Sequence, residues 1–169
     1  MRAGKLINPW LSQSIGDKMI KEGSKAPDFE LEGSDGKKHS LSEFKGKYVV
    51  LYFYPKDLTP GCTIEANEFN KHLPEIKKLG AEVVGVSKDD LKSHARFKDK
   101  CNLEFLLLSD PTSKMIKEYD SYGDRGIFGM GTIRNTVIID KSGKVAKFYQ
   151  KVKPNSHPKE VIEFLKSAK

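Results

Sequence analysis

The pattern of hydrophobic and polar positions changes period several times along the chain, and each change marks an element that we expect. Apolar and polar residues alternate in "APDFEL" (26–31), which predicts a half-buried strand. The unbroken β-branched and aromatic run "YVVLYFY" (48–54) predicts a central strand that is buried on both faces. Two further apolar runs, at 81–87 and 103–110, predict additional buried strands.

Helical spacing begins after Cys62, where every third or fourth residue is apolar as far as Ile76. Pro74 falls inside this pattern. A proline lacks the N–H of the helical hydrogen bond, so we expect a kink or break just before it. Gly80 follows as the signal that ends the helix.

Three later segments are also predicted to be helical. "DDLKSHARFKDKC" (89–101) has the composition of a charged surface helix. The segment 110–120 is expected to begin with Asp110 as its N-cap and Pro111 at its first position. The last helix is expected to start near Ser156.

The segments 132–140 and 144–151 flank the turn "KSG" and predict a β-hairpin. Strands and helices therefore alternate, which indicates an α/β fold with an antiparallel element at its end. Residues 1–18 have mixed polarity and no clear period, so we expect a flexible N-terminal extension there. Residues 19–169 are expected to form one domain.

Composition narrows the class of protein. The 169 residues are 37% hydrophobic and 31% charged, with no apolar run near the ~20 residues that span a bilayer. Two cysteines do not make a disulfide scaffold, so we expect a reducing compartment, the cytoplasm. The net charge is +7, and eight lysines fall in 141–169. Because they are spread out and not interleaved with aromatic residues, we interpret them as a solvated face. We expect no nucleic-acid or membrane partner.

Cys62 carries the strongest chemical signal, because it stands where a Pro- and Gly-containing turn becomes a helix. The unpaired N–H groups and the dipole of a helix N-terminus favour an anion, here the nucleophilic thiolate. Arg134 lies in an otherwise apolar stretch, where an unpaired charge is costly, and is a candidate cation for the thiolate. Thr59 offers a hydroxyl that both donates and accepts. The alternative is that Cys62 is a small buried hydrophobe at a generic anion site.

The stretch "YPKDLTPGCTIEANEF" (54–69) resembles the active-site segment of the peroxiredoxins, P-x-x-x-T/S-x-x-C, with Pro55, Thr59 and Cys62 at its fixed positions. The flanking segments resemble the bacterioferritin comigratory protein or peroxiredoxin Q subfamily, over about residues 21–167. This resemblance implies a thioredoxin-like fold, with a central mixed β-sheet flanked by helices and N-terminal β additions. It implies a thiol-dependent peroxidase that reduces hydrogen peroxide and organic hydroperoxides without a cofactor, with thioredoxin or another thiol as reductant.

The resemblance also assigns residue roles. Cys62 would be the peroxidatic nucleophile, which is oxidised to a sulfenic acid. Thr59 and Arg134 would complete the peroxide pocket, and Pro55 would shield it. We expect a monomer or a weak homodimer.

The resolving thiol is left open by the sequence. Many members of the subfamily carry a second cysteine five residues after the first, but this chain has Asn67 there. Cys101 is the resolving candidate, and attack by an external thiol is the alternative. Two other functions stay open: a thiol redox sensor, and a thioredoxin-fold holdase or interaction module without turnover.

The remaining polar residues give weaker signals. The histidines are scattered and show no metal-ligand spacing, so we expect no metal. His72 and His157 are expected to be exposed. Glu65 is placed in the first helical turn, where interaction with the helix dipole is a sufficient role, and orientation of Arg134 or of the backbone is the alternative.

Overall fold

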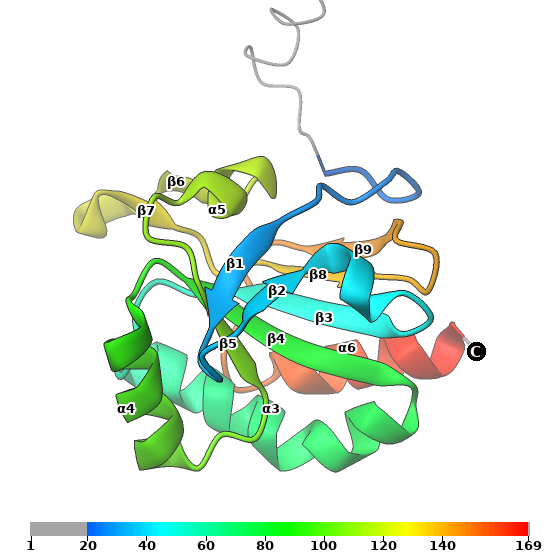
Figure 1. Ribbon diagram of the computed structural model, residues 1–169, viewed down its shortest axis with the longest axis horizontal. Helices are drawn as coiled ribbons and strands as arrows, with labels where there is room; N and C mark the ends of the chain where they lie inside the picture. The colour runs from blue at the N-terminus through cyan, green and yellow to red at the C-terminus, as the bar shows by residue number, and fades with distance from the viewer. Residues whose placement is uncertain (1–19, 169) are drawn as a thin grey trace, which may run out of the picture.

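The computed structural model describes residues 20–168, which form a seven-stranded mixed sheet with helices on both faces (Figure 1). The predicted extension, residues 1–18, lies outside the described residues. The strand order is β2-β1-β5-β4-β3-β8-β9, and β6 and β7 form a separate ribbon. In chain order the strands are β1 (Glu30–Gly33), β2 (Lys38–Ser40), β3 (Tyr48–Phe53), β4 (Ala81–Ser87), β5 (Leu106–Ser109), β6 (Tyr122–Asp124), β7 (Met130–Thr132), β8 (Thr136–Ile139) and β9 (Val145–Tyr149).

The helices divide between the two faces of the sheet (Figure 1). One face is covered by α3 (Pro60–Lys78), α4 (Leu91–Cys101) and α6 (His157–Ser167). The short helix α5 (Lys114–Glu118) and the 3-10 turn η1 (Leu41–Phe44) lie on the other. A second 3-10 turn, η2 (Gly126–Phe128), joins β6 to β7. The predicted α/β architecture is therefore confirmed.

The central strand β3 is buried on both of its faces. Its side chains alternate between two hydrophobic clusters, with Tyr52 facing α3 and Phe53 facing the opposite layer. Because both faces are buried, the strand is a continuous apolar run, as the sequence predicted. It pairs in parallel with β4 and antiparallel with β8, so the segment before β8 lies beside the carboxyl end of β3.

Of the kink or break expected before Pro74, the break is wrong, because α3 is a single helix from Pro60 to Lys78 with Pro74 inside it. The kink stays a prediction. An internal proline costs roughly 3 kcal/mol. Leu73 and Ile76, on either side of it, are fully buried, and each buried side chain of this kind contributes about 1.5–3 kcal/mol. Burial on both sides of the proline therefore offsets its cost. The helix ends at Lys78, and Gly80, the predicted stop signal, follows two residues later with a φ of +84°.

The predicted cap of α5 is also wrong. The helix begins at Lys114 with Ser113 as N-cap, and Asp110 lies further upstream. The buried Asp110 carboxylate still accepts a hydrogen bond from the backbone N–H of Ile116, at 2.9 Å. The start of α6 after Ser156 and the hairpin of β8 and β9 agree with the predictions.

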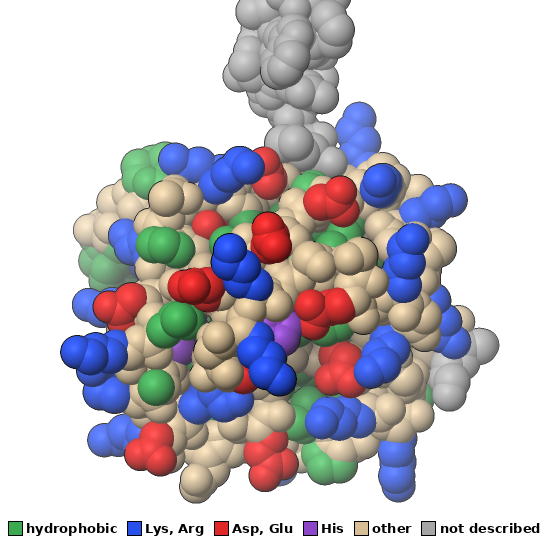
Figure 2. Space-filling view, in the orientation of Figure 1, with side chains coloured by type: hydrophobic (Ala, Val, Ile, Leu, Met, Phe, Trp, Pro, Cys, Tyr) green, Lys and Arg blue, Asp and Glu red, His purple; other side chains and the backbone are tan. Residues whose placement is uncertain are grey.

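The surface has the mixed character expected of a solvated face. Figure 2 shows Lys and Arg side chains spread over the face in view, with Asp and Glu between them. Among the described residues, no helix is long and apolar enough to cross a bilayer.

Candidate active site around Cys62

Cys62 lies in the first turn of α3, directly after the loop that leaves β3. Thr59 is the N-cap of this helix, with Pro60 at its first position, so the sequence order of the turn sets the helix start. The Cys62 side chain is 1% exposed. The Thr59 hydroxyl donates to the backbone carbonyl of Lys56 at 2.8 Å, which leaves its lone pairs free to accept.

Arg134 is brought to Cys62 by the sheet. It precedes β8 rather than lying within the strand, as the sequence had suggested. The backbone N–H of Phe53 bonds the carbonyl of Asn135 at 2.8 Å, which fixes this segment against the end of β3. Both Nη1 and Nη2 of Arg134 then lie 3.6 Å from Cys62 Sγ. Burial alone would lower the pKa of Arg134, but Cys62 and Glu65 outweigh burial and raise it, so the guanidinium is charged.

Glu65 lies behind the thiol and contacts the guanidinium of Arg134. Its side chain is fully buried, and Oε1 accepts from Arg134 Nη1 at 2.8 Å. Burial raises the pKa of Glu65 to about 7, although Arg134 opposes the shift. The first-turn placement expected for Glu65 is wrong, since no acidic residue lies in the first turn of α3. Glu65 instead holds the guanidinium that faces Cys62.

Pro55 lies in the loop that follows β3 and is half-buried. No hydrogen bond is available to a proline nitrogen, so its contribution is one of shape. The shielding role assigned to it by resemblance stays a prediction.

Cys101 is the last residue of α4, is half-buried and packs against the same core layer that contains Cys62. Both cysteines are free thiols. Burial raises the pKa of Cys101, with Lys100 opposing the shift.

Asn70 of α3 anchors the segment that follows Cys101 at the end of α4. Its Nδ2 donates to the carbonyl of Asn102 at 2.9 Å, and its Oδ1 accepts from the N–H of Glu104 at 2.8 Å. Asn70 comes eight residues after Cys62 in α3, or ~12 Å along the axis at about 1.5 Å per residue. A disulfide needs Cα atoms within roughly 7 Å. We therefore expect that joining the two cysteines requires rearrangement of α3 or α4.

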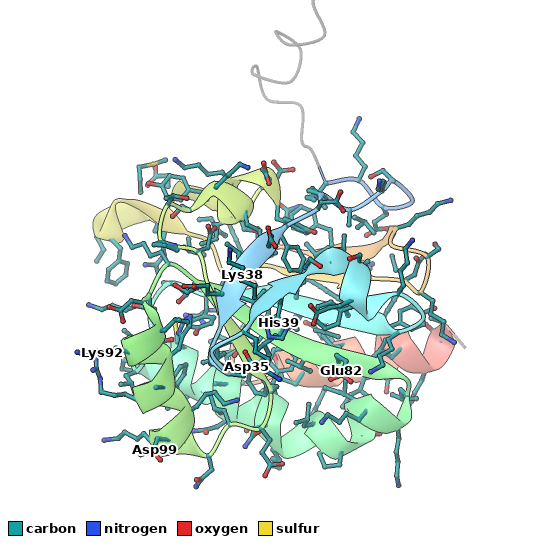
Figure 3. All side chains as sticks on the ribbon, viewed as in Figure 1. Asp35, Lys38, His39, Glu82, Lys92 and Asp99 are labelled. Atoms are coloured by element: carbon teal, nitrogen blue, oxygen red, sulfur yellow. The ribbon has the colours of Figure 1, made fainter. Side chains whose placement is uncertain are left out.

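The histidines fall outside this cluster, and the expectation that His72 and His157 are exposed is wrong. His72 is half-buried, with 19% of its side chain exposed. His157 is fully buried, with Nε2 2.8 Å from Thr136 Oγ1 and Nδ1 2.9 Å from Glu160 Oε1. A polar side chain at a helix start is buried here because both ring nitrogens find partners. Asp35 and His39 lie side by side on the β1–β2 hairpin (Figure 3), where His39 Nε2 is 2.9 Å from Asp35 Oδ2. Within residues 20–168, no group of three or more His, Cys, Asp or Glu residues is placed to hold a metal.

Known proteins are similar to this chain over most of its length. A family model described as AhpC/TSA matches residues 23–148. Peroxiredoxin Bcp of Bacillus subtilis (strain 168) is 46% identical over 150 residues, covering 87% of this chain and 96% of that protein.

Solved structures are similar over most of the chain. A crystal structure of a cysteine-to-serine mutant of PrxQ from Xylella fastidiosa has a TM-score of 0.86 and 32% identity, and the match covers 90% of this chain and 99% of that one. The bacterioferritin comigratory protein of Xanthomonas campestris, described with trapped intermediate/ligand complexes of alkyl peroxide reduction, has a TM-score of 0.82 at 35% identity. That match covers 88% of this chain and 99% of the other. The predicted thioredoxin-like fold is confirmed by these structures.

Proposed function

The chain belongs to the AhpC/TSA family and is a thiol-dependent peroxidase of the Bcp and peroxiredoxin Q group, and from this premise we propose that Cys62 is its peroxidatic nucleophile. The observation that carries the assignment is the position of Cys62 Sγ, at a helix N-terminus and 3.6 Å from both Arg134 nitrogens. Thiolate formation is favoured by both features.

The first half-reaction is a displacement on oxygen. The Cys62 thiolate attacks one peroxide oxygen, an S–O bond forms, and the O–O bond breaks. The second oxygen leaves with the electron pair and takes a proton to become water or an alcohol. Cys62 is oxidised to a sulfenic acid and the peroxide is reduced by two electrons.

Thr59 and Arg134 act on the peroxide oxygens in this scheme. The Thr59 hydroxyl donates to Lys56, so it accepts the hydrogen bond of the peroxide O–H and orients the molecule. The Arg134 guanidinium stabilises the charge that develops on the leaving oxygen. Pro55 limits the access of water to the sulfur. Hydrogen peroxide and organic hydroperoxides share the O–O–H group that these contacts recognise, so both are substrates in our proposal.

The second half-reaction returns Cys62 to the thiol. A thiolate attacks the sulfenic sulfur, an S–S bond forms, and the S–O bond breaks. The oxygen leaves as hydroxide and takes a proton to become water. We assign this step to Cys101, the only other cysteine of the chain, after rearrangement of the helices. Thioredoxin or another dithiol then reduces the disulfide. The cytoplasmic location and a monomer or weak homodimer stay predictions.

Replacement of the nucleophile tests the assignment directly. Cys62→Ser is expected to abolish peroxide consumption with dithiothreitol as reductant, because serine cannot form the sulfenic acid. Cys101→Ser, the matched variant at the other cysteine, should still consume one equivalent of peroxide. Full turnover by Cys62→Ser would contradict the proposal.

The resolving step is tested by peptide mass spectrometry after one equivalent of peroxide without reductant. We expect a crosslinked peptide that joins Cys62 and Cys101. A Cys62 sulfenic or sulfinic acid without this crosslink would instead assign resolution to an external thiol. A mixed disulfide with one protein partner, without turnover by dithiols, would identify a redox sensor.

A further inference from the structure

A buried polar network lies behind the loop that carries Thr59, and the reaction described above does not use it. Its centre is Asp57, which is 5% exposed. The carboxylate accepts from the Tyr54 hydroxyl at 2.6 Å and from the Ser93 hydroxyl at 2.7 Å. His94 Nδ1 lies 2.7 Å from Asp57 Oδ2, and the His94 side chain is fully buried.

The protons of this network can be placed from its partners. His94 Nε2 lies 2.9 Å from the carbonyl of Leu108, which only accepts, so Nε2 carries a proton. With three groups directed at its two oxygens, Asp57 acts as the carboxylate. His94 is then doubly protonated and the pair is ionic. Burial disfavours the imidazolium, but the hydrogen bond and charge of Asp57 outweigh it and raise the pKa of His94.

The network joins two parts of the site that are distant in sequence. Asp57 and Tyr54 belong to the end of β3 and its following loop, whereas Ser93 and His94 lie in α4, the helix that ends at Cys101. The outer face of α4 carries charged side chains such as Lys92 and Asp99 (Figure 3), whereas His94 is one of its two buried residues, with Phe97. A second anchor holds the same loop, because the backbone N–H of Asp57 donates to Asp89 Oδ2 at 2.8 Å.

The loop needs these anchors. Leu58, between Asp57 and Thr59, has a φ of +65° and is 39% exposed. A left-handed conformation costs a residue with a Cβ roughly 1–2 kcal/mol, so it persists only where the surroundings impose it. The two residues that follow are Thr59 and Pro60, which set the start of α3.

We propose that Asp57, held by His94 and Ser93 of α4, is a positioning residue for the peroxidase reaction: it fixes the strained loop so that the Thr59 hydroxyl faces the peroxide at Cys62. The inference rests on the proposed function, since it concerns the same sulfur. Asp57 touches neither Cys62 nor Arg134 through any described hydrogen bond, so its effect passes through the loop. The charge of the thiolate, which depends on Arg134 and the helix end, is left nearly unchanged.

Two reagents distinguish an effect on the Thr59 hydroxyl from an effect on the thiolate. Reduced wild type and Asp57→Asn are reacted with hydrogen peroxide and, separately, with iodoacetamide, and the rate constants of Cys62 are compared in a Cys101→Ser background. Iodoacetamide needs the thiolate but no oriented hydroxyl. We expect the peroxide rate constant to fall ten- to a hundredfold, the scale of a misplaced reacting group. The iodoacetamide rate constant should change by less than about threefold.

Two comparisons separate positioning from a general loss of structure. His157→Gln is the matched control. Like His94, His157 is fully buried and has its Nδ1 beside a carboxylate, in this case that of Glu160. Its rate constants should equal those of the wild type. Thr59→Val should reproduce the selective loss of Asp57→Asn. The double variant should then be no slower than Thr59→Val alone, since two residues that act through one group are not additive.

Each result decides a different point. The positioning role would be overturned by any of three results. The rate constants with both reagents could fall equally in Asp57→Asn, the losses could add in the double variant, or His157→Gln could show a similar loss. If wild-type Cys62 does not react faster with peroxide than with iodoacetamide, the proposed function itself fails. Rapid reaction of wild type with peroxide, together with an unaffected Asp57→Asn, would refute only this inference.

Discussion

At the scale of single residues, the ionisation of Glu65 is the feature with the clearest energetic consequence. Burial raises its pKa from an ordinary 4.5 to about 7. Between these values the folded state keeps a proton that the unfolded state has lost. Its contribution to the free energy of unfolding is therefore fully present below about pH 4.5 and is lost as the pH rises to about 7.

Glu65→Gln should remove this dependence. Because glutamine does not titrate, the fall in the free energy of unfolding between pH 5 and pH 8 should be smaller than in the wild type by about 2–3 kcal/mol. Urea unfolding at the two pH values measures the difference. Glu75→Gln, on the same helix but with a side chain that is 48% exposed, is the control and should match the wild type. If the free energy of unfolding falls by the same amount between pH 5 and pH 8 in Glu65→Gln and in the wild type, the buried carboxyl does not titrate in this range.

The site residues differ in how far the sequence could predict them. Cys62, Thr59 and Pro55 lie within one short segment, so a local pattern contains them. Arg134 was predicted because a charge in an apolar stretch needs a partner. Glu65 was assigned to the helix dipole, since its contact with Arg134 depends on a residue 69 positions away. The pairing of Asp57 with His94 has no local signal either, because it depends on how α4 packs.

At the scale of elements, the first turn of α3 contains a glycine, Gly61, at a position close to Arg134. A Cβ at Gly61 would lie 3.0 Å from Arg134 Nη2, closer than an ordinary van der Waals contact. The atom that it meets is the far end of a flexible side chain, which can move at little cost to folding. A shift of even a few tenths of an ångström would change the placement of Nη2 beside Cys62.

Gly61→Ala should therefore separate stability from activity. The free energy of unfolding should be equal to or slightly higher than that of the wild type, because alanine is favoured over glycine in a helix by up to about 1 kcal/mol. The rate constant of Cys62 with peroxide should fall by about tenfold, the scale of one lost charge-assisted contact. Unfolding curves and peroxide kinetics on the same sample provide the check. If Cys62 of Gly61→Ala reacts with peroxide as fast as in the wild type, the result would argue against a role for Arg134.

The elements themselves were predicted where burial imposes a period. The strand β3 is apolar throughout because both of its faces are covered, and α3 repeats its apolar positions because one side packs on the sheet. The ribbon of β6 and β7 was missed, since its strands have three residues each and include Gly123 and Gly131. The break at Pro74, the cap at Asp110 and the exposure of His72 and His157 were predicted wrongly, because tertiary burial outweighed a local signal.

At the scale of the whole molecule, the two cysteines belong to one core layer but to different helices. Cys62 stands at the start of α3 and Cys101 at the end of α4, and Asn70 connects the two helices. This connection holds the end of α4 ~12 Å along α3 from Cys62. We therefore expect it to be released when Cys101 moves to form a disulfide with Cys62, so that the hydrogen bonds of Asn70 oppose the second half-reaction.

Asn70→Ala removes both of these bonds, with Asn102 and with Glu104. Each bond of this kind contributes about 0.5–1.5 kcal/mol, so rearrangement should become easier and the disulfide should form up to about tenfold faster after one equivalent of peroxide. Quenched-flow alkylation followed by mass spectrometry gives the rate. Asn67→Ala is the control, because Asn67 is exposed on the same helix, and it should behave as the wild type. Equal disulfide rates in the two variants would show that the contact of α4 with α3 does not limit resolution. A lack of disulfide in both would assign the second thiol to another molecule, because Cys101 would then stay in its packed position while Cys62 turns over.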